Sequence, residues 1–308
     1  MTAYYRSPVD EVKRFFTSGS ALSVLILINI FIWFLVKIAS VIFFLFNRTD
    51  PAFAENWFLN FFAVPAFLPE LFSRPWTLIT YMFLHFDFFH ILFNMLWLYW
   101  FGRIFLEYLT SRQLLQTYFW GGIAGGFFYI LSFNIFPVFE KTLPLSLALG
   151  ASASVMAIVT AISFYVPNYS IQLLFIGRIK IVYLAVILFV IDFFGLSAGN
   201  PGGHLAHIGG AMWGFTYILL LKKGKLLPFM GLTDNWIKPL KKIFTSLKKQ
   251  KRNLSNFDTR PITDEEYNSA KIEKQKQIDK ILDKISKGGY ESLTKAEKEF
   301  LFKSSGKK

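Results

Sequence analysis

The chain contains no cysteine. Without thiols it has neither disulfide bonds nor a cysteine-ligated metal site, and the cysteine pattern gives no indication of the redox compartment. Charged residues are also scarce, at 17% of 308 residues, whereas 54% of the residues are hydrophobic and 19% are aromatic. Several apolar runs reach or approach the roughly 20 residues that cross a bilayer. The sequence therefore indicates an integral membrane protein.

Six apolar segments are expected to form membrane helices. They cover residues 21–46, 88–108, 113–134, 150–166, 179–196 and 204–222. The first segment is too long for the apolar core of a signal peptide, so we expect a retained signal anchor. An even number of spans leaves both termini on the same side of the membrane.

Positive charges predict which side that is. Arginine and lysine gather on the N-terminal side of the expected spans, whereas Arg48, Arg74 and Lys141 fall on the opposite side. Because cytoplasmic loops carry an excess of these residues, both termini are predicted to be cytoplasmic. We therefore expect a multi-pass membrane protein with this orientation.

The composition divides the chain into four parts. Residues 1–20 are expected to be a cytoplasmic N-terminus, 21–222 a membrane domain, 223–260 a basic linker and 261–308 a small helical cytoplasmic extension. Within the membrane domain, the segment Asn47–Asp87 is strongly apolar but interrupted by proline. We expect it to lie in the membrane interface or to pack against the helix bundle.

The extension has the pattern of a helical hairpin. Four apolar residues recur at the spacing of one helix face, namely Ile278, Ile281, Leu282 and Ile285. Gly288 and Gly289 predict the end of this helix, and Thr294 and Glu297 have the capping-box spacing that begins a second one. The lysine-rich linker favours anionic membrane lipids as a partner. No stacking or groove-reading motif accompanies it, so no nucleic-acid partner is predicted.

All four histidines of the chain lie in or beside expected spans: His85, His90, His204 and His207. Ionisable groups at membrane depth are costly, which favours a functional role, although a single membrane histidine can equally serve helix packing. His90 and Asn94 are four residues apart and share one helix face. Both side chains can donate hydrogen bonds, so they suit a developing oxyanion better than a cation.

Small residues recur every fourth position in two of the expected spans. One set is Ala153, Ala157 and Ala161, and the other is Ala206, Gly210 and Gly214. Such faces let membrane helices approach closely. If the two faces meet, Ser152 and His207 flank the same seam. A serine whose proton is taken by an adjacent histidine is an activated nucleophile, which predicts hydrolysis of an acyl bond.

With these residues, the sequence resembles the rhomboid family of intramembrane serine proteases. The resemblance covers about residues 20–222 and rests on three motifs in order: His85 with His90-x-x-x-Asn94, Gly150-Ala151-Ser152-Ala153, and Ala206-His207-x-x-Gly210-x-x-x-Gly214. It implies an all-α polytopic bundle of six transmembrane helices with a membrane-embedded first loop, in the plasma (inner) membrane of a bacterium. Relatives cleave other membrane proteins within or beside a transmembrane segment, and neither a cofactor nor a metal is expected.

The resemblance also implies the roles of the site residues. Ser152 is the expected nucleophile and His207 the general base, a dyad without an acidic third member. The backbone N–H of Ser152 and the side chains of His90 and Asn94 are expected to form the oxyanion hole. Supporting roles fall to five further residues: His85, Gly150, Ala153, Met156 and Gly210.

Two positions depart from the family pattern. Ala153 stands where relatives usually have glycine, and Met156 where an aromatic residue often lies under the catalytic histidine. A thioether can still pack on an aromatic edge. Near the site, His204 is expected to be solvated in a turn. Asp192 invites a triad, but we expect it to satisfy backbone groups or cap a helix.

Two other functions are compatible with parts of the pattern. A catalytically silent rhomboid-like protein would bind transmembrane helices without cleaving them, and the intact pair of Ser152 and His207 weighs against it. A proton-coupled transporter would use the histidines as a relay, but no convincing internal repeat is found. The oligomeric state is left open.

Overall fold

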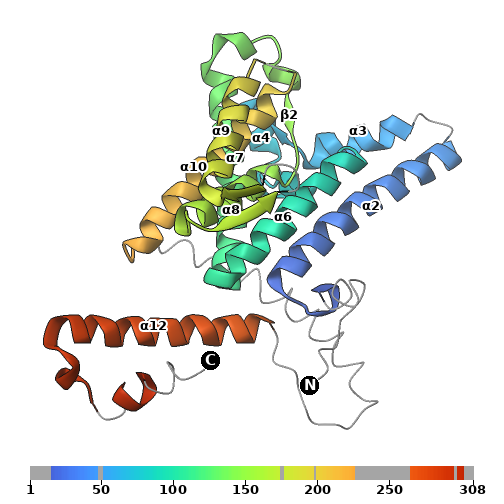
Figure 1. The fold of residues 1–308 in the computed structure, drawn as a ribbon. Coiled ribbons are helices and arrows are strands. Elements are labelled where there is room, and N and C mark those ends of the chain that lie inside the picture. The colour runs from blue at the N-terminus through green and yellow to red at the C-terminus, as the bar shows by residue number, and fades with distance from the viewer. Residues whose placement is uncertain are drawn as a thin grey trace, which may run out of the picture.

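The computed structural model describes residues 15–47, 51–173, 177–197, 199–225, 264–294 and 297–301 (Figure 1). Every segment expected to span the membrane contains a helix. These helices are α2 (Ala21–Asn47), α6 (Phe88–Tyr108), α7 (Ser111–Ile135), α8 (Ser152–Tyr165), α9 (Ile181–Gly195) and α10 (Pro201–Lys222). Among the described residues, α2, α6 and α10 are long and apolar enough to cross a membrane. The count of six spans stays a prediction.

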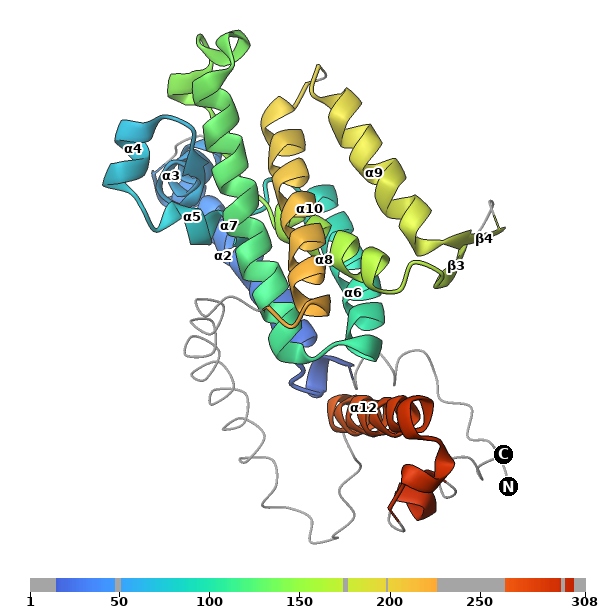
Figure 2. The same cartoon turned by 90° about the vertical axis from the view of Figure 1, so that its left-hand side faces the viewer.

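Helix α8 is the centre of the bundle. Its residues from Ala153 to Ser163 are all buried, although it is only 14 residues long. Figure 2 shows α6, α7 and α10 around it, with α9 beside α10 on the side away from α7. A helix that is apolar all round is one that other helices enclose. The nearly continuous burial of α8 therefore follows from its sequence of small and apolar residues.

Small residues set the close approach between α8 and α10. A β-carbon built on Gly210 would overlap the carbonyl oxygen of Ala153, and one on Gly214 would overlap that of Ala157. The two small-residue faces therefore meet, as the sequence spacing predicts. Bulky side chains at these positions would hold the two helices apart.

Glycines of α7 pack on the same alanines from another side, which the sequence analysis did not anticipate. A β-carbon on Gly121 would overlap that of Ala157, and one on Gly125 would lie 2.5 Å from the β-carbon of Ala153. The run GGIAGG at residues 121–126 carries the signal, because Gly121 and Gly125 share one helix face. Three helices thus converge on Ala153 and Ala157.

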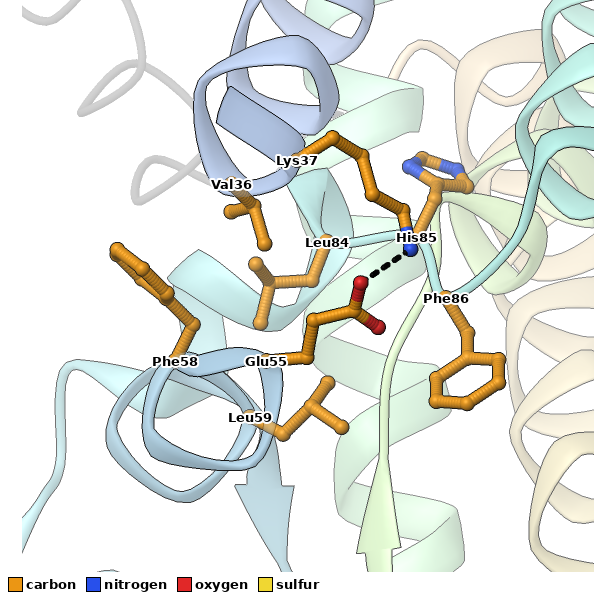
Figure 3. Close-up of a pocket in the computed structure, with 8 residues that line it drawn as sticks. All are labelled: Val36, Lys37, Glu55, Phe58, Leu59, Leu84, His85 and Phe86. Carbon is orange, nitrogen blue, oxygen red and sulfur yellow. Dashed lines mark hydrogen bonds and ion pairs between the residues drawn. The ribbon is translucent and has the colours of Figure 1, made fainter. Parts of the chain in front are cut away.

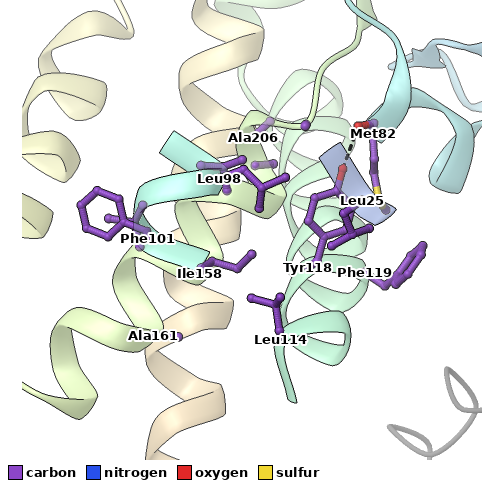
Figure 4. Close-up of a cluster of buried hydrophobic side chains, with 14 of the residues drawn as sticks. Leu25, Met82, Leu98, Phe101, Leu114, Tyr118, Phe119, Ile158, Ala161 and Ala206 are labelled. Atoms are coloured by element: carbon purple, nitrogen blue, oxygen red, sulfur yellow. Dashed lines mark hydrogen bonds between the residues drawn. The ribbon is translucent and has the colours of Figure 1, made fainter. Parts of the chain in front are cut away.

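Large buried side chains fill the space between these helices and α2 (Figure 4). Leu25 of α2, Leu98 of α6, Tyr118 of α7 and Ile158 of α8 are at most 2% exposed. The Tyr118 hydroxyl donates a hydrogen bond to the carbonyl oxygen of Met82 at 3.2 Å. This bond fixes the chain just before the first histidine to the core.

The segment that precedes α6 folds into short elements that pack on the bundle. It contains α3 (Pro51–Phe62), β1 (Val64–Pro65), α4 (Leu68–Ser73), α5 (Thr77–Thr80) and the 3₁₀ helix η1 (Tyr81–Phe83). The indole N–H of Trp76 donates to the carbonyl oxygen of Phe61 at 2.9 Å, and the Asn134 amide of α7 donates to that of Ala66, also at 2.9 Å. Packing of this segment against the bundle is therefore confirmed.

The description of the fold as all-α needs a small correction. β1 pairs with β2 (Leu147–Ala148), and β3 (Ser170–Leu173) forms an antiparallel hairpin with β4 (Gly177–Lys180) between α8 and α9. Exposed and half-buried residues alternate along β3 and β4, as in a strand with one face on the protein. Strands this short give little signal in a single sequence. Short 3₁₀ helices η2 (Pro137–Phe139) and η3 (Leu143–Leu145) lead from α7 into β2.

The C-terminal part contains α12 (Asp264–Gly288) and the 3₁₀ helix η6 (Tyr290–Ser292). Gly289 has a φ of +71°, so the predicted helix stop is confirmed. The backbone N–H of Thr294 donates to Glu297 Oε2 at 2.7 Å, and the Glu297 N–H donates to Thr294 Oγ1 at 3.3 Å. The capping box is confirmed as well. Residues 1–14 and 226–263, which include most of the predicted linker, lie outside the described residues.

The apolar stripe of α12 is only partly as expected. Ile281 is buried and Ile278 and Ile285 are half-buried, but Leu282 is 50% exposed. Leu293, beyond the glycine stop, is buried too. An ion pair from Lys284 Nζ to Glu297 Oε2, at 3.0 Å, joins the two arms of the hairpin.

Candidate active site

Ser152 is the first residue of α8 and follows a sharp turn. Gly150 has a φ of +121°, a conformation that L side chains rarely adopt, and its N–H donates to the carbonyl oxygen of Tyr81 at 2.9 Å. The Ala151 N–H donates to His85 Nε2 at 3.4 Å. The chain before Ser152 is thus held on both sides by the segment that precedes α6. His85 therefore contacts this turn, and its supporting role in the reaction stays a prediction.

The start of α8 offers backbone donors. The first N–H groups of a helix have no partner inside it, and the helix dipole adds partial positive charge there. No side chain caps α8, since its N-cap residue is Ala151. The N–H of Ser152 therefore belongs to a helix end that suits an anionic oxygen.

His90 lies directly beside this turn. A β-carbon on Gly150 would lie 2.8 Å from His90 Nε2 and 3.6 Å from Ser152 Oγ. The His90 ring also meets the His85 ring edge to face, with 5.0 Å between centroids. Only glycine at position 150 leaves room for the imidazole next to the serine. The structure thus brings Ser152, His90 and His85 together around Gly150.

Asn94 lies one turn after His90 on α6 and is buried. Its side-chain amide donates to the carbonyl oxygen of His90 at 3.0 Å. An amide nitrogen carries two hydrogens, so this bond leaves one for another acceptor. Asp87 caps α6, because its Oδ1 accepts from the His90 N–H at 2.8 Å, and this cap fixes the start of the helix two residues before His90.

His207 and His204 share one carboxylate. Both Nδ1 atoms lie 2.8 Å from Oδ1 of Asp192, in the last turn of α9. A carboxylate only accepts hydrogen bonds, so each imidazole carries its proton on Nδ1 and its lone pair on Nε2. The expectations that His204 is solvated in a turn and that Asp192 serves backbone groups or a cap are therefore wrong. The expected absence of an acidic partner for His207 is corrected too.

These contacts depend on how α9 and α10 meet. Asn200 caps α10, with its Oδ1 accepting from Gly203 N–H at 3.1 Å, and Pro201 occupies the first turn. The turn folds α10 back along α9 (Figure 2). Both histidines thereby contact Asp192 in the last turn of α9. The sequence signal was available, because Asp192 is the only acidic residue in the apolar run IVYLAVILFVIDFFG.

The two histidines have different surroundings. A β-carbon on Gly195 of α9 would lie 2.6 Å from His204 Nε2, so the His204 ring lies flat against the end of α9. His207 instead follows Ala206, whose carbonyl oxygen lies beside Gly125 together with the β-carbon of Ala153, the residue after Ser152. Of the two, His207 is therefore the histidine on the side of the serine.

The two family departures are accommodated differently. The β-carbon of Ala153 points at Gly125, whose own missing side chain provides the space. Met156 is buried in α8, and its packing on His207 stays a prediction. Ser154 is fully buried, facing α7, where a β-carbon on Gly122 would lie 2.6 Å from its Oγ. Ser154 therefore points away from the seam of His207.

A pocket beside His85 contains an ion pair that the sequence analysis missed (Figure 3). Lys37 Nζ of α2 lies 2.7 Å from Glu55 Oε1 of α3, and the ammonium is 5.9 Å from the centroid of the Phe86 ring. Lys37 interrupts the first apolar run, which was the available signal. The pair fastens α3 to α2 next to the histidine that supports the Ser152 turn.

Comparisons with known proteins match two regions of the chain. Residues 73–224 match the rhomboid domain, and residues 263–307 match a family of unknown function, DUF6576. The chain is 29% identical over 162 residues to RHOMBOID-like protein 12, mitochondrial, of Arabidopsis thaliana. That match covers 50% of this chain and 48% of the relative, so the chain spans about half the length of that relative.

The matched region holds the whole constellation from His85 to Gly214, and apolar helices carry it. The chain therefore contains a rhomboid domain, and its apolar helices are those of a membrane protein.

Proposed function

We propose that the protein is an intramembrane serine endopeptidase in which Ser152 is the nucleophile and His207 the general base. The observation that carries this proposal is the contact of His207 Nδ1 with Asp192 at 2.8 Å. It leaves the lone pair of Nε2 free of the carboxylate and available for a serine proton. The protease class of the family supports the same reaction.

In the proposed reaction, Ser152 Oγ attacks the carbonyl carbon of the scissile peptide bond while its proton passes to His207 Nε2. Asp192 stabilises the imidazolium that forms. The oxyanion accepts hydrogen bonds from the Ser152 N–H, from His90 and from the second hydrogen of the Asn94 amide. His207 then gives its proton to the leaving amine, and water hydrolyses the acyl-enzyme by the same steps.

The length of α8 supports a site below the membrane surface. A helix of 14 residues is about 21 Å long, whereas the apolar layer of a bilayer is about 30 Å thick. If the C-terminal end of α8 lies at one interface, Ser152 lies within the layer. Transmembrane or juxtamembrane segments of other membrane proteins are the proposed substrates.

The orientation is part of the proposal. Six spans with both termini in the cytoplasm place Ser152 toward the opposite face of the membrane, in a bacterial plasma membrane. The excess of positive charges on the N-terminal side supports it. The C-terminal hairpin is then a cytoplasmic extension, joined to residues 21–222 through the basic segment at 223–260.

Reconstitution tests the proposal directly. The full chain is placed in liposomes with a single-span substrate that carries a small-residue site, and the products are identified by mass spectrometry. Cleavage that is lost in Ser152→Ala and in His207→Gln supports the assignment. Cleavage that survives in Ser152→Ala would overturn it.

A second measurement distinguishes a catalytically silent protein from one whose nucleophile is not Ser152. A fluorophosphonate probe should label Ser152 in the wild type and leave both Ser152→Ala and His207→Gln unlabelled. A folded chain that binds the single-span substrate but neither cleaves it nor takes up the probe would instead be a catalytically silent rhomboid-like protein.

A further inference from the structure

We propose that Asp192, His204 and His207 form a binding site for a zinc-type divalent cation, and that the ion switches the peptidase off. The inhibition rests on the proposed function, whereas binding of the ion does not. The ligand atoms of the three residues all lie within 4.8 Å of one another. They come from two adjacent helices, with the histidines one turn apart on α10 and the aspartate on α9.

The donor set suits zinc. Two imidazole nitrogens and one carboxylate oxygen are typical ligands of this metal, at about 2.0–2.2 Å each. Neighbouring ligand atoms in such a site are roughly 3.3 Å apart. The present contacts from Asp192 to the two Nδ1 atoms are 2.8 Å, so only a small opening of the cluster is needed. Water takes the fourth position.

The aspartate of the cluster is more deeply buried than its two histidines. The Asp192 side chain is 9% exposed, whereas those of His204 and His207 are 24% and 25% exposed. The carboxylate is therefore fixed in the protein, and the imidazoles are open enough for an ion to reach them. Gly195 adds space, because any side chain there would press on the His204 ring.

The effect on hydrolysis follows from the chemistry of imidazole. A metal binds Nδ1 through its lone pair, so the proton of a neutral, metal-bound His207 sits on Nε2. An Nε2 that already carries a proton cannot take one from Ser152. The ion therefore removes the general base by reversing the tautomer that Asp192 otherwise selects. Removing the ion restores that tautomer and the activity.

Binding is tested without catalysis. The full-length Ser152→Ala protein, carrying no histidine tag, is titrated with Co²⁺ in detergent, and the visible absorption of four-coordinate cobalt is recorded. We expect absorption bands that Zn²⁺ abolishes by displacement, and that His204→Gln and Asp192→Asn lose. His85→Gln is the matched control and should keep the bands. Bands that are absent, or equally strong in His204→Gln, would overturn the site.

Inhibition is tested on the active protein. Zn²⁺ should stop cleavage reversibly, with recovery after addition of a chelator. The rate of each variant is compared with its own rate in chelator. For half inhibition, His204→Gln should need a Zn²⁺ concentration at least about 10-fold higher than the wild type. Full activity at saturating Zn²⁺ would overturn the switch even if cobalt binds. Absence of cleavage in chelator would count against the proposed function, and the cobalt titration would still decide the site.

Discussion

Oδ1 of Asp192 lies 2.8 Å from Nδ1 of His207, although 15 positions separate the two residues in the chain. The contact joins the last turn of α9 to the first turns of α10. It turns a predicted serine-histidine pair into an arrangement with an acidic partner. The same oxygen also accepts from His204, so one buried carboxylate orients two imidazoles.

Asp192→Asn should slow cleavage strongly while the protein stays folded. An amide can present its NH₂ to Nδ1, which favours the tautomer with its proton on Nε2. We expect kcat to fall by about 100-fold or more with little change in KM, because the change affects the transition state rather than binding. Single-turnover cleavage in liposomes measures it. An unchanged kcat in the folded variant would remove Asp192 from the reaction.

Gly125→Ala should destabilise the bundle. The added β-carbon would lie 2.5 Å from that of Ala153 and 2.7 Å from the carbonyl oxygen of Ala206. Overpacking of this kind costs about 1–3 kcal/mol, which thermal unfolding in detergent detects. Adding Ala153→Gly should recover part of the loss by removing one of the two clashes. If the loss of stability in the double variant equals the sum of the two single losses, the two positions are not coupled.

Gly150→Ala should damage the site, whereas Gly177→Ala should not. Both glycines have a positive φ, at +121° and +86°, so alanine strains the backbone in each case, by about 1–3 kcal/mol. At position 150 the new β-carbon also presses on His90 Nε2, but at position 177 nothing lies within 4 Å. Cleavage and probe labelling should fall only in Gly150→Ala. Equal losses in both variants would attribute the effect to backbone strain alone.

Lys37→Ala and Glu55→Ala should each destabilise the protein, and the sum of their two losses should exceed the loss in the double variant. Each single change leaves one charge without its partner beside the apolar segment. The side chains are 32% and 21% exposed, so we expect a coupling of about 1–2 kcal/mol, between the values of exposed and buried pairs. Thermal unfolding of the four proteins of the cycle gives this energy. Additive losses would mean that the ion pair contributes nothing.

The C-terminal hairpin should weaken only in strong acid. Hydrogen bonds from the Thr294 N–H, from Lys284 and from the Thr294 hydroxyl lower the pKa of Glu297 from 4.5 to about 2. A lowered carboxyl pKa stabilises the fold fully above pH 4.5, and this stabilisation is lost as the pH falls toward 2. The carboxyl ¹³C shift of Glu297, assigned by comparison with Glu297→Gln, should titrate near pH 2. A midpoint near 4.5 would mean that the capping box is not formed.

The helices and the main candidate residues were accessible from the sequence. Apolar runs of sufficient length predict helices in a membrane protein because backbone groups there must be paired within the segment. The histidine-asparagine and alanine-glycine spacings identify residues that share a helix face. These are local patterns, which is why helices α2, α6, α7, α8, α9 and α10 lie where the spans were expected.

Other features depended on which helices become neighbours. Gly125 accommodates Ala153 because α7 passes beside α8, and the sheet register joins Val64 to Ala148 across 84 positions in the chain. The short hairpin of β3 and β4 carried too little periodicity to be predicted. In each case the deciding contact lies between distant segments.

The sequence by itself determined the helices, the small-residue faces and the identities of Ser152, His207, His90 and Asn94 as candidates. The tertiary structure decided the partners: it placed Asp192 on both His204 and His207, and it separated His204, against Gly195, from His207 on the side of Ser152. The physical reason is that a charged group in an apolar helix must find a partner across the bundle. The spacing along one chain does not say which of several partners the packing will bring within 2.8 Å.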